Sequence, residues 1–218
     1  HMPEEPVFLE NIASAHMNAD HYAEAEEYLV RLLDTGSGGS VRAYEMIAEI
    51  AKEKGEFERA AATLEEALKM EPENSKVRLD LARLLVRRTL WEDARGHLES
   101  LRSDDDADTA AEARELLQKV REATETRYEC SSCGREWWVP NDVDPPERVR
   151  LYGELPKESP AGKCDSCGRI YCIECAMQHM EGNRFVCPHC EVRLKLSDGG
   201  LKYLAVRYAE HHAEHNEE

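Results

Sequence analysis

Apolar residues recur every three or four positions along residues 6–125, with charged residues between them. This spacing places the apolar side chains on one face of a helix, and the abundant Ala, Leu and Glu favour helices. A longer period of 34 or 35 residues overlies the helical one. Matching positions are Ile12, Ala13, Tyr22, Ala25 and Leu29; then Ile47, Ala48, Phe57, Ala60 and Leu64; then Leu81, Ala82, Trp91, Ala94 and Leu98. The pattern therefore predicts a series of helices that repeats along the chain.

Residues 55–72, GEFERAAATLEEALKMEP, resemble the tetratricopeptide repeat. That repeat is a pair of antiparallel helices with small residues where they cross and a proline at the exit. The resemblance implies three repeats, at roughly 6–40, 41–74 and 75–106. In the third repeat, Thr89 stands in place of the turn glycine and Asp106 in place of the exit proline. The alternative is an ordinary helical bundle in which the 34-residue spacing is a coincidence.

A further helix is expected from about residue 108 to 124, where its apolar face would cover the open end of the repeats. Proteins that carry these repeats hold a peptide or helix in a concave groove lined by the first helix of each repeat. The resemblance places Glu10, Arg42, Glu45, Glu49, Lys52, Lys76 and Arg83 there. Their basic members would form either a strip that binds an acidic peptide or an ordinary solvated face.

All 8 cysteines lie between residues 130 and 190, in four Cys-x-x-Cys pairs. The pairs are Cys130 and Cys133, Cys164 and Cys167, Cys172 and Cys175, and Cys187 and Cys190. This clustering favours metal binding over a disulfide framework or redox chemistry, which are the alternatives. Eight thiolates predict two Zn²⁺ ions. Because cysteine fills all four positions at each ion, the zinc is expected to be structural rather than catalytic.

The order in which the pairs share ions is open from the spacing alone. The four-residue gap between Cys167 and Cys172 suits a turn that sends consecutive pairs to different ions. Residues 164–175 and 185–190 resemble the cross-brace zinc domains of the FYVE and RING families. The resemblance implies one ion on Cys130, Cys133, Cys172 and Cys175, and a second on Cys164, Cys167, Cys187 and Cys190. The alternative is two successive ribbons, each built from neighbouring pairs.

The two families use such a domain differently. FYVE domains bind phosphoinositides through a basic run, but Lys163 is the only base in SPAGKC, so lipid recognition is not expected. RING domains recruit a ubiquitin-conjugating enzyme through an apolar residue in the first cysteine pair and a proline in the last. Here the first position holds Ser131 and Ser132, whereas Pro188 is present. Ligase activity is therefore the alternative function.

Trp137 and Trp138 lie between the first two cysteine pairs, in a stretch too rich in proline for a helix. A short strand followed by an ordered loop is expected, and the tryptophans either anchor a partner or, as we favour, pack against the protein. Residues 191–196 alternate like a strand. After them, Gly199 and Gly200 are expected to interrupt the regular structure before a C-terminal helix. The apolar stripe of that helix must dock on the zinc domain, the repeats or another subunit.

The formal net charge is −17, and residues 1–125 account for −13 of it, with 16 Lys and Arg against 29 Asp and Glu. This argues against nucleic-acid binding, which needs a clustered basic face. The sequence contains neither an apolar run long enough to cross a bilayer nor a signal peptide, so a cytoplasmic protein is expected. No nucleophile with a base, phosphate loop or open metal site is evident, and no catalytic residue is assigned.

Together these patterns predict a mainly α protein. Three helical hairpins with a capping helix would occupy 6–125, a small α+β two-zinc domain 126–198, and a C-terminal helix and tail 199–218. The predicted function is a non-enzymatic adaptor whose groove holds a protein or peptide and whose zinc domain presents a second surface. Partner contacts are assigned to Arg42, Glu45, Glu49, Lys52, Lys76, Arg83, Trp137, Trp138 and Pro188. The alternative is a RING-like ligase in which the repeats recruit the substrate.

Overall fold

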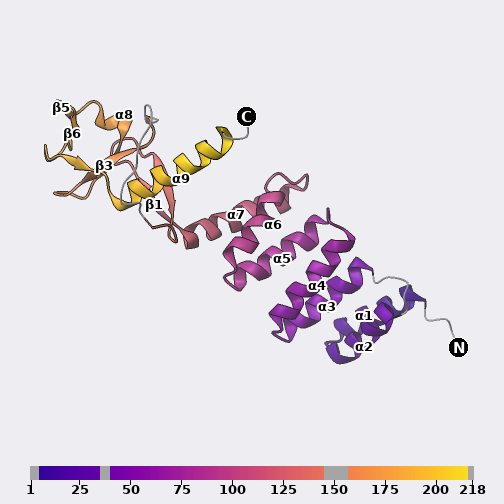
Figure 1. The fold of residues 1–218 in the computed structure, drawn as a ribbon. Helices are drawn as coiled ribbons and strands as arrows, with labels where there is room; N and C mark the ends of the chain where they lie inside the picture. Colours follow the sequence, from indigo (N-terminus) through magenta and orange to yellow (C-terminus); the bar gives the residue numbers. More distant parts are fainter. Residues whose placement is uncertain (1–4, 35–39, 145–156, 216–218) are drawn as a thin grey trace. The chain divides into compact units, whose positions relative to one another are not determined.

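The computed structural model describes residues 5–34, 40–144 and 157–215. Contacts divide the chain into two units, residues 1–121 and 122–218, called here the helical unit and the cysteine unit. Figure 1 shows helices throughout the first and short strands with two helices in the described part of the second. Among the described residues, no helix has the length and apolar character needed to span a membrane.

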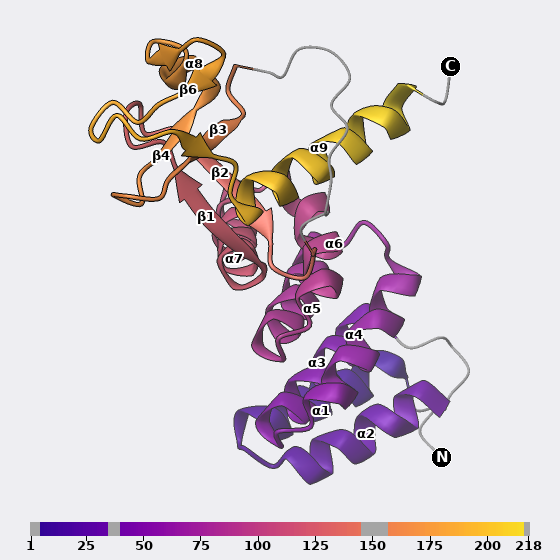
Figure 2. The same ribbon diagram turned by 60° about the vertical axis from the view of Figure 1, so that its left-hand side comes forward.

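The helical unit consists of successive antiparallel hairpins. Its helices are α1 (Pro6–Asn18), α2 (Tyr22–Asp34), α3 (Val41–Glu53), α4 (Phe57–Met70), α5 (Ser75–Arg87), α6 (Trp91–Leu101) and α7 (Ala107–Thr124), the last of which extends past the division at residue 121. Consecutive helices pack as the pairs α1 with α2, α3 with α4, and α5 with α6. Figure 2 shows these hairpins stacked in chain order. The predicted three hairpins are confirmed.

Polar caps explain where two of these helices begin. The Oγ of Ser40 accepts a hydrogen bond of 3.1 Å from the backbone N–H of Ala43, at the start of α3. The Oδ1 of Asn74 accepts an equivalent bond of 3.1 Å from Val77, at the start of α5. Each cap satisfies a backbone donor that the first helical turn leaves without a partner. The same local chemistry therefore starts the first helix of the second and third hairpins.

Small residues at the helix crossings let the helices approach closely. Ala48 and Ala60 are 1 % and 0 % exposed, and Leu64 fills the space beside them at 1 %. The capping helix α7 joins the same core, because Ala113 and Val120 pack in the cluster that contains the buried leucines of α5 and α6. The predicted capping helix is therefore confirmed, and burial of this continuous apolar core stabilises the unit.

One matching position of the repeats differs in exposure. Ile12 of α1 is 38 % exposed, whereas its counterparts Ile47 and Leu81 are 6 % and 0 % exposed. Phe8, four residues earlier in α1, is also exposed, at 61 %. The counterparts are covered because each packs in a core cluster with residues of the preceding hairpin. The repeat pattern correctly indicated which face is apolar, but not that this first copy lies open.

The cysteine unit is built from short antiparallel strands. Its elements are β1 (Glu125–Glu129), β2 (Glu136–Pro140), β3 (Pro160–Cys164), β4 (Ile170–Cys172), α8 (Ile173–Ala176), β5 (Met180–Glu181), β6 (Arg184–Phe185), β7 (Leu194–Lys195) and α9 (Asp198–His215). Strands β1 and β2 form a hairpin, β5 and β6 form another, and β3 lies between β4 and β7 in a three-stranded sheet. The expected short strand around the tryptophans is β2. The rest of the proline-rich stretch, residues 145–156, lies outside the described residues.

Two expectations for the C-terminal segment need correction. The strand expected over 191–196 is limited to Leu194–Lys195, preceded by a single bridge between Val186 and Arg193. Gly199 and Gly200 do not break the chain but lie in the first turn of α9. A Cβ on Gly199 would stand 2.4 Å from the Cζ of Tyr128, so glycine is needed there because the helix passes close to β1.

The C-terminal helix docks within the cysteine unit. Leu204 is 2 % exposed, and Tyr203 packs on the cluster formed by Cys130, Trp137 and Cys172. Figure 2 shows α9 beside the β1 and β2 hairpin, and α9 contacts β2 and β3. These residues of α9 therefore pack on the cysteine unit itself, which is one of the three docking surfaces that the sequence left open.

Candidate metal centres

Three of the four cysteine pairs lie in turns between strands, and the fourth begins a helix. Cys130 and Cys133 lie in the turn from β1 to β2, while Cys164 ends β3 and Cys167 lies in the turn that leads to β4. Cys187 and Cys190 lie between β6 and β7, while Cys172 and Cys175 span the junction of β4 with α8. In every pair the first cysteine is buried and the second is more exposed.

The three turns share one pattern of backbone hydrogen bonds. In each turn, the backbone N–H of the first cysteine donates a hydrogen bond to the carbonyl of the residue five positions later. The donor–acceptor distance is 2.7 Å in the Cys130 turn and 2.8 Å in the Cys164 and Cys187 turns. The carbonyl of the same cysteine accepts a hydrogen bond from the N–H of the residue four positions later, at 2.9 Å, 2.8 Å and 2.9 Å in the same order. The residue four positions on has positive φ in all three, at 73° for Gly134, 72° for Gly168 and 56° for Glu191. Glycine is the residue expected at a left-handed position, so the sequence signals Gly134 and Gly168, whereas glutamate at position 191 gives no such signal.

The fourth pair is organised by the start of α8. Cys172 caps the helix, and its Sγ accepts a hydrogen bond of 3.4 Å from the backbone N–H of Cys175. The N–H of Cys172 in turn donates to the Sγ of Cys130 at 3.4 Å. A further bond of 2.8 Å joins Ser131 N–H to the carbonyl of Ile170, so the first turn is fastened to β4. These bonds bring the first and third pairs together.

The eight sulfurs gather in two groups of four. Group 1 contains Cys130, Cys133, Cys172 and Cys175, group 2 contains Cys164, Cys167, Cys187 and Cys190, and the sulfurs within each group lie within 4.8 Å of one another. The first and third pairs thus share one group, and the second and fourth pairs share the other. This is the crosswise grouping that the cross-brace resemblance implies, rather than two successive ribbons.

The sulfur separations distinguish a metal site from a disulfide. The Sγ of Cys172 lies 3.8 Å from those of Cys130 and Cys133, and the Sγ atoms of Cys167 and Cys187 are 3.7 Å apart. A disulfide would bring two sulfurs to about 2.05 Å, and all eight cysteines are free. Four sulfurs at about 2.3 Å from one ion would stand about 3.8 Å apart at the corners of a tetrahedron. The residues therefore fit a tetrahedral metal ion.

The surroundings of the sulfurs affect their protonation unequally. Burial opposes ionisation of Cys130, but backbone N–H groups of Cys133, Cys172 and Ser132 lower its pKa to about 7. Burial likewise opposes ionisation of Cys187, but hydrogen bonds from the backbone of His189 and the hydroxyl of Tyr171 lower its pKa to about 6. Each group therefore has one thiol prepared for the thiolate form, which is the form that binds metals.

The residues assigned to partner contacts in the cysteine unit differ in exposure. Trp137 is 3 % exposed, and its indole Nε1 donates a hydrogen bond of 2.9 Å to the carbonyl of Glu158. Trp138, the next residue of β2, is half-buried. Pro188 is exposed between the last two cysteines. Trp137 therefore packs inside the unit, as favoured from the sequence, while Pro188 lies on its surface.

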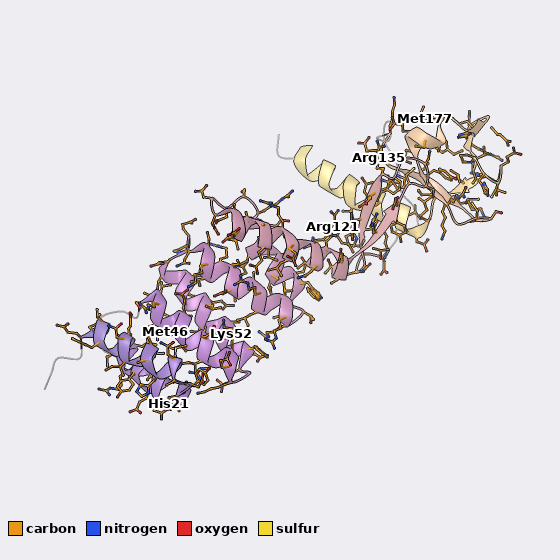
Figure 3. All side chains as sticks on the ribbon, turned by 180° about the vertical axis from the view of Figure 1, so that it is seen from behind. His21, Met46, Lys52, Arg121, Arg135 and Met177 are labelled. Carbon is orange, nitrogen blue, oxygen red and sulfur yellow. The ribbon has the colours of Figure 1, made fainter. Side chains whose placement is uncertain are left out.

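Most residues assigned to the groove are joined in ion pairs. Lys76 pairs with Glu45 at 2.8 Å, and Lys52 pairs with Glu49. Arg83 forms two bonds of 2.6 Å to the carboxylate of Glu112 on α7. Figure 3 labels Lys52 among the side chains of the helical unit. Three of the four bases in the suggested strip are thus neutralised by nearby carboxylates, whereas Arg42 is exposed with no such pair among the described residues.

Comparison with known proteins bears on the helical unit. Residues 51–120 match the family model described as tetratricopeptide repeat. A tetratricopeptide repeat protein from Parabacteroides merdae superposes with a TM-score of 0.50 at 18 % identity, over 56 % of this chain and 48 % of that one. The chain thus spans about half the length of that protein. No curated protein sequence matches this chain.

Two further structures have lower scores. The type III secretion translocator chaperone SycD of Yersinia enterocolitica gives a TM-score of 0.47 at 12 % identity, covering 53 % of this chain and 82 % of that one. Yeast Tom70 gives a TM-score of 0.46 at 18 % identity, covering 55 % of this chain and 26 % of that one. The match over 51–120 and the hairpin architecture agree with the repeat pattern. The helical unit therefore has the fold of tetratricopeptide repeat proteins, with residues 51–120 similar to that family, and the unit that follows it holds two groups of four cysteines.

Proposed function

We propose that this protein is a non-enzymatic adaptor, in which the repeats bind a protein or peptide partner and a two-zinc domain presents a second binding surface. The spacing of the sulfurs in closed groups of four is the observation that carries this proposal. Cysteine would fill all four positions around each ion, leaving none for water or substrate. A centre of this kind supports a fold, so function is to be sought on the surfaces.

The cysteine side chains would hold the two ions and orient the unit around them. Bound Zn²⁺ would supply folding free energy that such a small apolar core does not provide. One ion would link the turn between β1 and β2 to the start of α8. The other would link the turn after β3 to the segment that follows β6. Free, clustered thiols fit a reducing compartment such as the cytoplasm.

Metal content and partner binding test the two halves of the proposal separately. Protein purified without chelators is expected to contain two equivalents of zinc by elemental mass spectrometry. A partner captured on the intact chain from its source cells is expected to be lost with Arg42→Glu, which reverses an exposed charge on α3. It should be retained with Lys69→Glu, a matched reversal on α4. Absence of zinc would refute the metal centres, and turnover of a substrate without a retained partner would refute the adaptor.

Ubiquitin ligase activity is the second candidate, favoured by the crosswise grouping and by exposed Pro188. The exposed loop would then contact a ubiquitin-conjugating enzyme, and the repeats would recruit the substrate. The intact zinc-loaded chain should accelerate ubiquitin discharge from such an enzyme, and Pro188→Ala should weaken that acceleration. Discharge at the rate of the conjugating enzyme alone, across the enzymes of the source organism, would exclude this candidate.

A further inference from the structure

Helix α1 has an exposed apolar face at one end of the helical unit. Phe8 and Ile12 are 61 % and 38 % exposed, and Val7 beside them is 64 % exposed. Asn11 and Ala15, spaced three or four positions from these two along the same side of the helix, are exposed as well. Figure 1 shows the first hairpin, in indigo, at the opposite end of the unit from α7. The exposed stripe is called here the α1 face and consists of Phe8, Asn11, Ile12 and Ala15.

The next repeat shows what such a face is shaped to receive. Thirty-five positions later, the equivalent places of α3 hold Ala43, Met46, Ile47 and Ile50. All four are buried, and they are the residues that α3 contributes to the core cluster it shares with α1 and α2. Figure 3 labels Met46 among them. In the second hairpin, this face therefore packs on the helices of another hairpin, and in α1 the same face is open.

Charge limits which protein can cover the α1 face. Residues 1–125 carry a net charge of −13, so two copies of this chain repel each other over most of that surface. Helix α1 is the exception, because Glu10 is its one charged residue, counting Lys, Arg, Asp and Glu, whereas each helix from α2 to α7 has between 4 and 7. Glu10 lies on nearly the opposite side of α1, where its carboxylate accepts a hydrogen bond from the hydroxyl of Ser40. The α1 face is therefore a place where two copies can meet without opposing charges.

The sizes of the side chains also suit a second copy of the same helix. In a two-fold symmetric contact, each residue meets its partner reciprocally on both chains. An antiparallel pair of α1 helices centred between positions 11 and 12 brings the large Phe8 of each chain against the small Ala15 of the other. It also keeps the acidic Glu5 residues, which precede the two helices, at opposite ends of the pair. A parallel pair would instead place Phe8 on Phe8 and Glu5 beside Glu5.

We propose that the α1 face is a homodimer interface, through which two copies of this chain pack antiparallel about a two-fold axis. One helix from each copy gives a small contact, and interfaces that bury less than about 1,200 Å² are weak. The dimer therefore forms and dissociates with concentration. For the proposed adaptor, it joins two sets of repeats and two cysteine units in one particle, so a target with two binding motifs is held more tightly. The interface itself requires neither metal nor partner.

Sedimentation of the intact chain over a concentration series tests the dimer. The mass of the wild type is expected to rise from that of one chain toward that of two between about 1 μM and 1 mM, the range of weak affinities. Ile12→Glu should raise the dissociation constant at least about 10-fold, because like charges then lie close together near the two-fold axis. Val30→Glu adds the same charge at a 46 % exposed position of α2, and this matched control should dimerise like the wild type.

A mixture of two variants tests the antiparallel register. Asn11→Lys changes an exposed position, so it should weaken the dimer without unfolding the helix, and it remains informative if Ile12→Glu does not fold. In the proposed register, position 12 of one chain faces position 11 of the other. Ile12→Glu mixed with Asn11→Lys should therefore restore association that each variant alone has lost, whereas Val30→Glu mixed with Asn11→Lys should not.

Photo-crosslinking identifies the occupant of the α1 face. A benzophenone group in place of Phe8 is expected to react with residues around Ala15 of a second chain. Mixing ¹⁵N-labelled and unlabelled protein distinguishes the two chains, because a crosslink between copies yields peptide pairs of mixed isotope content in mass spectrometry. A crosslink that joins α1 to any other helix of the second copy would contradict the symmetric contact.

The outcomes separate this inference from the proposed adaptor function. Wild-type protein that remains monomeric up to about 1 mM would overturn the dimer, and so would a dimer that Ile12→Glu and Asn11→Lys leave intact. A monomer whose position 8 crosslinks to a different protein in its source cells would show that another partner covers the α1 face, which also overturns it. Protein that dimerises as expected but binds no zinc would refute the metal centres alone.

Discussion

Thr89 occupies the same left-handed turn position as Gly55, 34 residues earlier in the chain. Their φ angles are 60° and 75°. The backbone N–H of each residue donates a hydrogen bond of 3.0 Å to the carbonyl of the residue three positions earlier. The N–H of the next residue donates to the carbonyl five positions earlier, at 2.9 Å for Leu90 and 2.8 Å for Glu56. The two helix ends therefore have the same geometry, although threonine is branched at Cβ and glycine has no Cβ.

Thr89→Gly is expected to stabilise the helical unit. A side chain in the left-handed region costs about 1–2 kcal/mol, and the flexibility of glycine in the unfolded chain offsets part of that. The net gain should be about 1 kcal/mol in urea unfolding followed by far-UV circular dichroism. Asp20 has the same conformation at φ 57°, but aspartate tolerates it better, so Asp20→Gly should gain less. A loss of stability in Thr89→Gly would contradict the expectation that the left-handed backbone at Thr89 is strained.

Gly199→Ala is expected to loosen α9 from the cysteine unit. Alanine normally favours a helix over glycine by about 1 kcal/mol, but here its Cβ would overlap the ring of Tyr128, and overpacking costs about 1–3 kcal/mol. Hydrogen exchange of α9 amides should therefore become faster. Gly96→Ala in α6 is the matched control, because no atom lies within 4 Å of its Cβ position, and it should stabilise its helix. Equal effects at both positions would contradict the close approach.

The contribution of Glu26 to stability should depend on pH. Its hydrogen bond with Lys54 is the main cause that lowers the pKa of Glu26, and Arg59 lowers it further. Because the folded pKa lies below the unfolded value of about 4.3, the contribution is present above that value and is lost as pH falls through the folded pKa. Glu26→Gln should cost about 0.2–1 kcal/mol at pH 7, and the difference from wild type should shrink below about pH 4.

An exposed pair provides the comparison for Glu26. Glu66 and Lys69 of α4 are joined at 2.6 Å, but their side chains are 53 % and 68 % exposed. Solvent screens such a pair, so Glu66→Gln should leave urea unfolding at pH 7 unchanged. A loss in Glu26→Gln that persists unchanged to pH 3 would show that packing, rather than charge, accounts for the effect.

Removal of metal should affect the two units differently. Chelation, or Cys172→Ser, is expected to unfold residues 126–198 while the helical signal of 6–125 persists. The reason is that Cys172 is fully buried and its sulfur lies 3.8 Å from two others of group 1. Limited proteolysis with mass spectrometry would locate the cleavage sites, and Ser131→Ala on the exposed turn is the control. Simultaneous loss of both units would contradict the predicted domain boundaries.

Much of the helical unit was predictable because its information is local and repeated. The spacing of Ala48, Ala60 and Leu64 indicated which residues meet at the helix crossings, and these side chains are buried. Ion pairs such as Lys76 with Glu45 were not predictable, because they join residues of different hairpins whose relative rotation is set by packing. The same holds for Gly199, whose neighbour Tyr128 lies 71 positions earlier in the sequence.

For the candidate site, the sequence by itself determined that cysteines act in pairs and that two pairs end in a glycine followed by arginine. A turn of six residues is governed by its own hydrogen bonds, so its chemistry can be read directly from the sequence. Only the tertiary structure decided which pairs share a group, that Glu174 receives Arg135, and that Tyr171 faces Cys187. These relationships join residues 16 to 45 positions apart, and the distances between their side chains depend on how β3, β4 and α8 pack together.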